Sequence, residues 1–196
     1  MQLIFATNNR NKVEEIRKII RSFDVITMGE AGIAEDIPEP FDTLEENAFA
    51  KSIFIYKRTG KACFSEDTGL EVYALNGEPG VRSARYAGEP SNPGKNTELL
   101  LNKLNGITER KARFRTVVSL IYNKVEYQFD GICEGKIITE KTGDKGFGYD
   151  PVFIPDGSEK TFAEMPVEEK NVFSHRKKAV QKLIDFINSL DAATTH

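Results

Sequence analysis

The amino-acid sequence predicts a three-layer α/β or α+β protein with a mixed sheet. Two short apolar runs, residues 3–6 and 62–65, have the length and composition of buried strands. Other stretches carry apolar residues at helical spacing. An alternating run at 112–122 turns at Asn123-Lys124 into a second run at 125–129, which is typical of an antiparallel hairpin. A chain with both crossover helices and a hairpin is expected to build a sheet with parallel and antiparallel strands.

The first helix is expected directly after the strand at 3–6 and a polar loop at 7–11. Asn11 is its expected N-cap, because Glu14 follows three residues later. The apolar residues of this helix recur every three or four positions: Val13, Ile16, Ile19, Ile20 and Phe23.

A second helix is expected from Thr43 to about Arg58, since Glu46 completes a capping box and Gly60 is a stop signal. The strand at 62–65 comes next. A run at 70–75 follows and ends in the turn Asn76-Gly77. The next helix is marked by Leu99, Leu100, Leu101 and Leu104 and stops at Gly106; the hairpin and a short strand at 151–154 come after it. The final helix is capped by Ser174 and has Ala179, Leu183, Ile187 and Leu190 on its apolar face.

The composition excludes several classes of protein. Hydrophobic residues make up 39% and charged residues 29% of the chain, which is too apolar for disorder and too charged for a membrane protein. No run approaches the ~18 apolar residues of a spanning helix, and no secretory signal is visible. A net charge of −3 argues against a general nucleic-acid binder. Cys63 and Cys133 form no CxxC pair, so reduced thiols and a cytoplasmic location are expected.

Charge is unevenly distributed along the chain. Residues 24–46 contain eight acidic residues and no Lys or Arg, whereas 110–115 and 170–178 are basic. An acidic and a basic region in one small protein suit a metal-bound polyanion, and the alternative is that these runs are ordinary solvated surfaces.

Two loops near strands are candidates for phosphate and metal binding. The loop 7–12 joins the first strand to the first helix, whose free backbone N–H groups attract anions, or its side chains serve merely as caps. Glu66 and Asp67 follow the strand at 62–65, so their carboxylates are expected to project from the strand end and to hold Mg²⁺ and orient a water. The alternative is a turn capped by Asp67, with Gly69 at positive φ.

Two further segments are candidates for recognising a base. In residues 146–151, two glycines allow close approach of backbone to a ligand, Phe147 and Tyr149 offer planar faces, and Asp150 offers acceptors; the alternative is a tight turn. In residues 170–176, His175 adjoins Arg176, whose planar fork suits acceptors, although a histidine near a cap is more often structural.

Taken together, these segments resemble the inosine triphosphate pyrophosphatase family, the Ham1-like house-cleaning enzymes. The resemblance covers nearly the whole chain, with the motifs in order: residues 6–9 with Lys12 and 15–16, residues 43–48 with Lys51, and then residues 66–70, 76–88, 146–151, 170–171 and 174–176. The family commonly has Ser where this chain has Thr68 and often Asp where it has Glu66.

The resemblance implies a fold and an activity. The implied fold is one domain, 1–196, with an elongated mixed sheet and two lobes around a central nucleotide cleft, to which we add residues 191–196 as a flexible tail. The implied activity is Mg²⁺-dependent hydrolysis of ITP, dITP and XTP to monophosphate and pyrophosphate, in a homodimer. The composition adds the expectation of a cytoplasmic protein that binds neither nucleic acid nor membrane.

The site residues follow from matching the motifs to this chain. Asp67 is the expected general base, with Lys12 as its catalytic partner. The expected metal ligands are Asp67, Glu66 and Glu39. The expected substrate-binding residues are Thr7, Asn8, Asn9, Arg10, Asn11, Lys12, Lys51, Thr68, Phe147, Gly148, Tyr149, Asp150, Lys170, His175 and Arg176.

Base selectivity is expected to rest on hydrogen-bond donors. Arg176 and Lys170 carry only donors, and His175 can donate too, so these side chains should accept purine O6 and reject the amino group of adenine. Phe147 would stack on any purine.

Two alternatives to this function remain: a catalytically silent nucleotide-binding or regulatory module on the same scaffold, and a Maf-like nucleotide pyrophosphatase.

Overall fold

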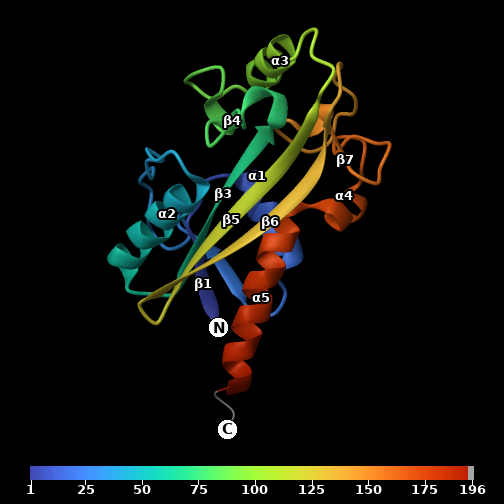
Figure 1. Ribbon diagram of the computed structural model, residues 1–196. Coiled ribbons are helices and arrows are strands. Elements are labelled where there is room, and N and C mark those ends of the chain that lie inside the picture. Colours follow the sequence, from blue (N-terminus) through green and yellow to red (C-terminus); the bar gives the residue numbers. More distant parts are fainter. Residues whose placement is uncertain (194–196) are drawn as a thin grey trace. The chain divides into compact units, whose positions relative to one another are not determined.

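The computed structural model describes residues 1–193 and, of the side chains, those up to residue 190 (Figure 1). Its sheet has seven strands in the order β2-β1-β3-β5-β6-β7, with β4 paired to β3. β1 is parallel to β2 and β3, whereas β4 and β7 are antiparallel to β3 and β6, so the expected mixed sheet is confirmed. The strands are β1 Gln2–Phe5, β2 Asp24–Thr27, β3 Cys63–Val72, β4 Pro79–Gly80, β5 Lys111–Tyr122, β6 Val125–Ile137 and β7 Phe153–Pro155.

The described chain contains α-helices and short 3₁₀ helices between the strands. The α-helices are α1 Arg10–Ile19, α2 Leu44–Thr59, α3 Pro93–Lys103, α4 Val167–Phe173 and α5 His175–Ala193; the 3₁₀ helices are Tyr73–Leu75, Ser83–Arg85 and Asp150–Val152. Because α5 continues to Ala193, the first part of the expected tail at 191–196 is helical backbone. Residues 194–196 lie outside the described residues.

The helix ends show where sequence signals decide local structure. α2 begins as expected, because the Thr43 side chain accepts a hydrogen bond from the Glu46 N–H, and it ends at Gly60 in the left-handed conformation. The expected cap of α1 was wrong by two residues: Asn9, and not Asn11, accepts from the Lys12 N–H. Several polar residues in a row are possible caps by residue type, so the sequence alone did not single out Asn9.

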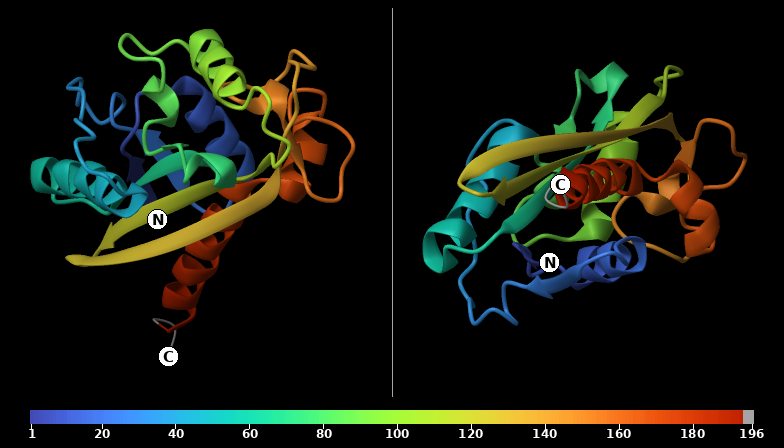
Figure 2. Two further views of the ribbon diagram at one scale, coloured as in Figure 1. Left: turned by 45° about the horizontal axis from the view of Figure 1, so that its top comes forward. Right: turned by 90° about the horizontal axis from the view of Figure 1, so that it is seen from below.

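The chain forms two compact units, of which unit 1 comprises residues 1–67, 116–131 and 176–196. Successive side chains along β1 point to opposite faces of the sheet. Leu3 and Phe5 therefore pack with α1 and α5, whereas Ile4 and Ala6 pack with α2. α2 therefore covers one face of β1 and the pair α1 and α5 covers the other, an arrangement that Figure 2 allows the reader to follow. Unit 1 thus has the three layers that the sequence predicts.

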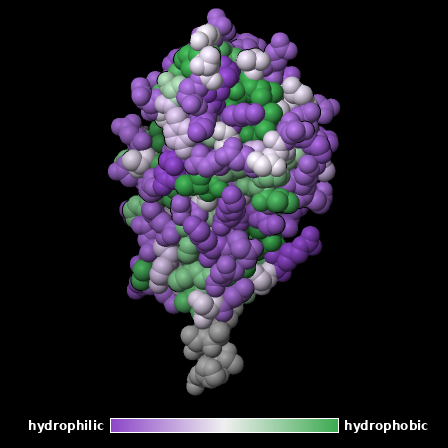
Figure 3. All heavy atoms as spheres, turned by 45° about the vertical axis from the view of Figure 1, so that its right-hand side comes forward, coloured by the Kyte–Doolittle hydropathy of each residue, from purple (hydrophilic) through white to green (hydrophobic). Residues whose placement is uncertain are grey.

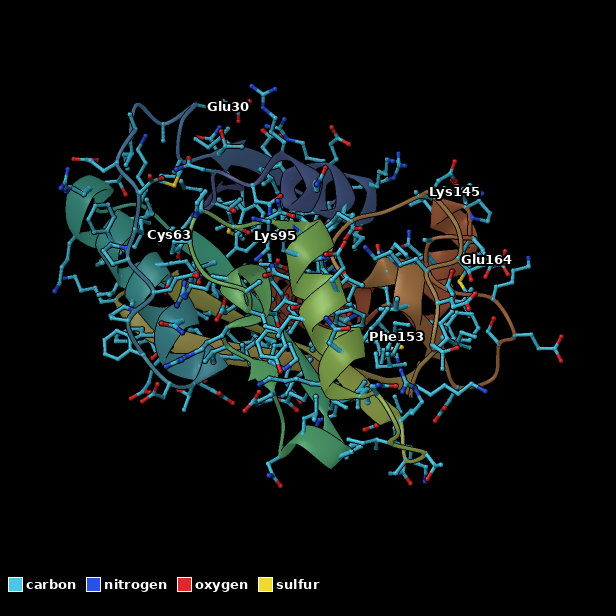
Figure 4. All side chains as sticks on the ribbon, turned by 90° about the horizontal axis from the view of Figure 1, so that it is seen from above. Glu30, Cys63, Lys95, Lys145, Phe153 and Glu164 are labelled. Carbon is cyan, nitrogen blue, oxygen red and sulfur yellow. The ribbon has the colours of Figure 1, made fainter. Side chains whose placement is uncertain are left out.

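Unit 2 comprises residues 68–115 and 132–175 and has a core of its own. Phe153 packs against Phe114 and Phe162, with ring centroids 4.7 and 5.2 Å apart. Figure 4 shows Lys145 and Glu164 close together, and the Lys145 Nζ donates to the Glu164 carbonyl at 3.1 Å. This contact ties the segment before the glycine-aromatic loop to the segment that follows β7.

Strand β3 differs from the expectation in a way that matters for the site. Glu66 and Asp67 lie within this strand, so the prediction that they project from a strand end was wrong. Gly69 also lacks the positive φ that the turn alternative required; a Cβ there would lie 2.7 Å from the Gly80 carbonyl oxygen of β4. The glycine therefore serves the close approach of two strands, which local sequence does not show.

Other elements were missed or misjudged in length. β2, β4 and α4 were not predicted, because two are very short and β2 has little apolar character beyond Val25 and Ile26. β6 is longer than the expected run at 125–129 and reaches Ile137. The turn at Asn123-Lys124 is confirmed, with φ of 50° and 68°, as a two-residue hairpin requires.

Figure 3 shows one side of the molecule, on which hydrophilic residues dominate and hydrophobic ones appear in separate patches. Within the described part of the chain, no helix is both long and apolar enough to span a bilayer.

Candidate active site

Lys51 is the centre of the first charged group in unit 1. It projects from α2 and is buried, and its Nζ donates to the Asp67 Oδ1 at 3.1 Å and to the Glu39 Oε1. Asn47, one turn earlier on α2, exchanges two hydrogen bonds of 3.0 Å with the backbone of Phe41. These two hydrogen bonds fix the segment that carries Glu39. Glu39, from the acidic stretch, therefore contacts the same Lys51 as Asp67 of β3.

Glu66 is the centre of the second charged group in unit 1. Its oxygens accept from the Arg176 Nε at 2.7 Å and Nη2 at 3.0 Å, and the Lys12 Nζ lies 3.1 Å from Oε1. Arg176 also donates to Glu15. Sequence reasoning missed Glu15, although its position three residues after Lys12 on α1 puts both on one helix face.

The electrostatics of these groups follow from burial and pairing. Burial raises the pKa of Asp67, and this effect outweighs the nearby lysines, so the pKa lies above its ordinary value. Burial alone would lower the pKa of Lys51, but attraction to Asp67 and Glu39 is stronger and raises it. Burial would raise the pKa of Glu66, but Arg176 and Lys12 hold it well below its usual range. Neighbouring carboxyls thus have pKa values shifted in opposite directions.

The loop 7–12 is ordered by its own side chains. The Thr7 Oγ1 accepts from the Asn9 N–H at 3.1 Å, and Asn9 caps α1. Asn8 donates to Asp36 at 3.1 Å, while Arg10 and Asn11 are exposed at the first turn of the helix. The structure therefore places Lys12 in the charged groups and leaves the start of α1 accessible.

In unit 2, Asp150 organises the glycine-aromatic loop. Its Oδ2 accepts from the Phe147 N–H at 2.9 Å and from the Lys170 Nζ at 2.8 Å. Gly146 has φ of 73°, and a Cβ there would lie 2.0 Å from the same Oδ2. The Lys170 Nζ also lies 5.4 Å from the centre of the Phe147 ring. The expected residues Phe147, Asp150 and Lys170 are thus brought together.

Two of the remaining expected residues of unit 2, Tyr149 and His175, are buried, and two, Thr68 and Gly148, are half-buried. The Tyr149 hydroxyl donates to the Ser83 carbonyl at 2.9 Å, so it anchors the loop. The His175 ring is buried and stacks on Phe114 with centroids 4.7 Å apart. Gly148 has φ of 64°, and Thr68 is a half-buried residue of β3.

Much of the uneven charge has a structural explanation. Glu30 and Glu35 of the acidic stretch form exposed ion pairs with Arg17 and Arg58. In the basic run, Arg110 donates to the carbonyls of Leu104, Ile137 and Ile138. The alternative of ordinary solvated surface therefore holds for Glu30 and Glu35. Arg110 instead holds backbone carbonyls, and Glu39 belongs to the charged group around Lys51.

The charged group around Lys51 offers the carboxylate oxygens of Asp67 and Glu39 to a metal ion. Among the described residues, no three His, Cys, Asp or Glu side chains are grouped to hold a metal. Mg²⁺ commonly takes one or two protein carboxylates together with substrate phosphates. Asp67 and Glu39 fit that pattern, because both point at the same Lys51 Nζ. Glu66 fits less well, since Arg176 and Lys12 occupy its oxygens.

The fold and the charged groups together define an α/β protein in which a buried lysine, Lys51, and the buried carboxylates of Glu66 and Asp67 are gathered on one strand and its neighbouring helix. The chain belongs to the Ham1 family, whose family model matches residues 3–186.

Named relatives and solved structures are similar over nearly their full lengths. A Porphyromonas gingivalis protein named dITP/XTP pyrophosphatase is 52% identical over 188 residues, or 95% of this chain and 97% of that protein. A Flavobacterium johnsoniae protein of the same name is 48% identical over 190 residues, or 96% and 99%. The Staphylococcus aureus Ham1 protein structure has a TM-score of 0.88 and 39% identity, and covers 96% of this chain and 99% of its own. The suspected family is thereby confirmed.

Proposed function

We propose that this protein hydrolyses non-standard purine nucleoside triphosphates, such as ITP, dITP and XTP, to the monophosphate and pyrophosphate. The observation that carries the proposal is the two charged groups at neighbouring residues of β3, in which Lys51 contacts Asp67 and Lys12 contacts Glu66. The names of the relatives, dITP/XTP pyrophosphatase, support the substrate class. Such an enzyme acts on the free nucleotide pool, which is consistent with a cytoplasmic protein that needs neither nucleic acid nor membrane.

Residues of unit 1 are assigned to the phosphates. The N-terminus of α1 and the side chains of the loop 7–11 supply donors to an anion. Lys12 and Lys51 neutralise charge that develops on the leaving pyrophosphate. Asp67 and Glu39 would hold Mg²⁺, which when bound supplies further positive charge beside the scissile phosphate and lowers the pKa of a bound water.

Asp67 is assigned as the general base. A carboxylate that accepts a proton from water works best when its pKa is raised toward the operating pH, and burial raises the pKa of Asp67. Lys51, 3.1 Å away, holds this carboxylate in place. A catalytically silent binding module would have no need of this arrangement.

Residues of unit 2 are assigned to the purine. Phe147 and Gly148 would receive the ring face, with Thr68 as a further contact, while Tyr149 and Asp150 hold the loop. Lys170 and His175 supply donors that match purine O6, and adenine would leave them unmatched. Arg176 donates to Glu66 and Glu15, so we assign it to that network in place of reading O6.

The test is a nucleotide panel with the purified protein and Mg²⁺. We expect pyrophosphate and monophosphate from ITP, dITP and XTP, with kcat/KM well ahead of ATP and GTP. Orthophosphate and diphosphate as primary products would contradict the assignment of the cleaved bond. Comparable kcat/KM for ATP and ITP would contradict the reading of O6 while leaving the pyrophosphatase proposal standing.

A further inference from the structure

The Glu66 carboxylate is surrounded by cations inside unit 1. Its side chain is 0% exposed, and both oxygens are used: Arg176 donates to each, through Nη2 at 3.0 Å and Nε at 2.7 Å. Lys12 adds a third contact at 3.1 Å, to Oε1. A bidentate guanidinium–carboxylate pair fixes the plane and the position of the carboxylate.

These contacts link four side chains in series. Lys12 of α1 contacts Glu66 of β3, Glu66 contacts Arg176 of α5, and Arg176 contacts Glu15, which is again on α1. The series therefore begins and ends on the same helix. The long Lys12 side chain, 16% exposed, is held at the one point where its Nζ meets a fixed carboxylate.

This geometry separates Glu66 from the other carboxylates of unit 1. A metal ion on Glu66 would have to displace Arg176 or Lys12, and the displaced cation would lose its contact with this buried carboxylate. Asp67 and Glu39 instead share the single Lys51 Nζ. The neighbours Glu66 and Asp67 therefore have different surroundings, although the sequence offers them as one acidic pair.

We propose that Glu66 is a positioning residue for Lys12, locked in place by Arg176, and is not a metal ligand. The proposal rests on the function proposed above, in which Lys12 binds phosphate. An anchored lysine does not have to be ordered when the phosphates arrive, so less conformational entropy is lost on binding. Glu66 thereby contributes to the affinity for phosphate through Lys12.

The test measures binding of inorganic pyrophosphate to the metal-free protein by calorimetry in EDTA. We expect Glu66→Gln and Lys12→Met each to weaken this binding about tenfold, the loss typical of a charged hydrogen bond. In the Glu66→Gln background, Lys12→Met should weaken binding by less than about threefold, because the lysine is no longer held. This measurement needs neither metal nor turnover, so it stands apart from a failure to hydrolyse ITP.

Two further variants control for folding and charge. Glu66→Asp keeps the charge that Arg176 requires but is one methylene shorter, so it should fold and still bind pyrophosphate more weakly, having lost its reach to Lys12. Glu71→Gln removes a carboxylate of the same strand that pairs with Arg113, and should leave pyrophosphate binding unchanged.

Three results would overturn the proposal. Tighter pyrophosphate binding by Glu66→Gln would mean that Glu66 acts only as a negative charge. Unchanged binding by both Glu66 variants would mean that it serves the fold alone. A Mg²⁺ half-saturation for ITP hydrolysis at least tenfold higher in Glu66→Asp, with wild-type pyrophosphate binding in EDTA, would mean that Glu66 is a metal ligand.

Discussion

At the scale of single residues, Asp67 is assigned two functions, as the general base and as a residue that would hold Mg²⁺. Replacing it by Asn keeps the shape and removes the base, so Asp67→Asn is expected to lower kcat by at least about 10²-fold. Steady-state kinetics with ITP measure the loss, and thermal unfolding checks that the variant is folded. Glu71→Gln on the same strand is the matched control and should keep the wild-type kcat. A folded Asp67→Asn protein with near-normal kcat would leave the silent binding module as the better interpretation.

Glu66 allows a second prediction at this scale, on pH and stability. The pKa of Glu66 is lower in the folded chain than in the unfolded chain because of Arg176 and Lys12, although burial opposes them. Its contribution to the free energy of unfolding is therefore complete above the unfolded pKa and is lost as pH falls toward the folded pKa. Removing one partner of a buried ion pair costs about 3–5 kcal/mol.

The measurement is the melting temperature of wild type and Glu66→Gln across pH. The difference in melting temperature between the two proteins, which we call the gap, should be constant from about pH 6 to 8. It should narrow below about pH 4.5, where the carboxyl groups of the unfolded chain are protonated. Other acidic residues are common to both proteins and cancel in the comparison. A gap that stayed constant down to pH 3 would show that the charge of Glu66 contributes nothing to stability.

At the scale of elements, the pairing of β3 with β4 depends on a glycine. A Cβ at position 69 would lie 2.7 Å from the Gly80 carbonyl oxygen, which is backbone and cannot swing away. Gly69→Ala is therefore expected to push the strands apart and to cost about 1–3 kcal/mol, as overpacking does. Denaturant unfolding measures the loss.

Gly29→Ala is the matched control for this prediction. Its φ is not positive, and its nearest neighbour would be the Thr27 Oγ1 at 3.9 Å, so the added methyl group fits. Its stability should change by less than about 0.5 kcal/mol. Equal effects of the two substitutions would show that β3 and β4 have room for a methyl group at position 69.

The secondary-structure elements also show what kinds of sequence signal are reliable. α2 is bounded by Thr43 and Gly60 as predicted, because a side-chain cap and a left-handed glycine act within a few residues of the chain. The cap of α1 and the extent of β3 were misjudged. Asn9 and Asn11 are equivalent caps locally, and β3 continues past Asp67 because partner strands complete its hydrogen bonds.

At the scale of the whole molecule, we propose a homodimer. The resemblance to the Ham1-like enzymes motivates it, and static light scattering at micromolar concentration tests it. We expect a mass near twice the 22.0 kDa of one chain. A mass near 22.0 kDa at that concentration would exclude the dimer under those conditions. The measurement should be repeated with pyrophosphate, since a ligand that prefers one assembly shifts the equilibrium.

The sequence by itself determined the class of fold and the family. Hydrophobic periodicity and caps act over short distances, and the motifs stand in a fixed order, so both can be read from a linear chain. Tertiary structure alone decided how the charges are paired. Glu39 meets Lys51 across twelve residues, and Arg176 meets Glu66 across 110. Such pairs form only when folding brings distant segments together, and burial then makes each charge require its partner. For that reason Glu66 and Asp67, adjacent in sequence, have pKa values shifted in opposite directions and different partners.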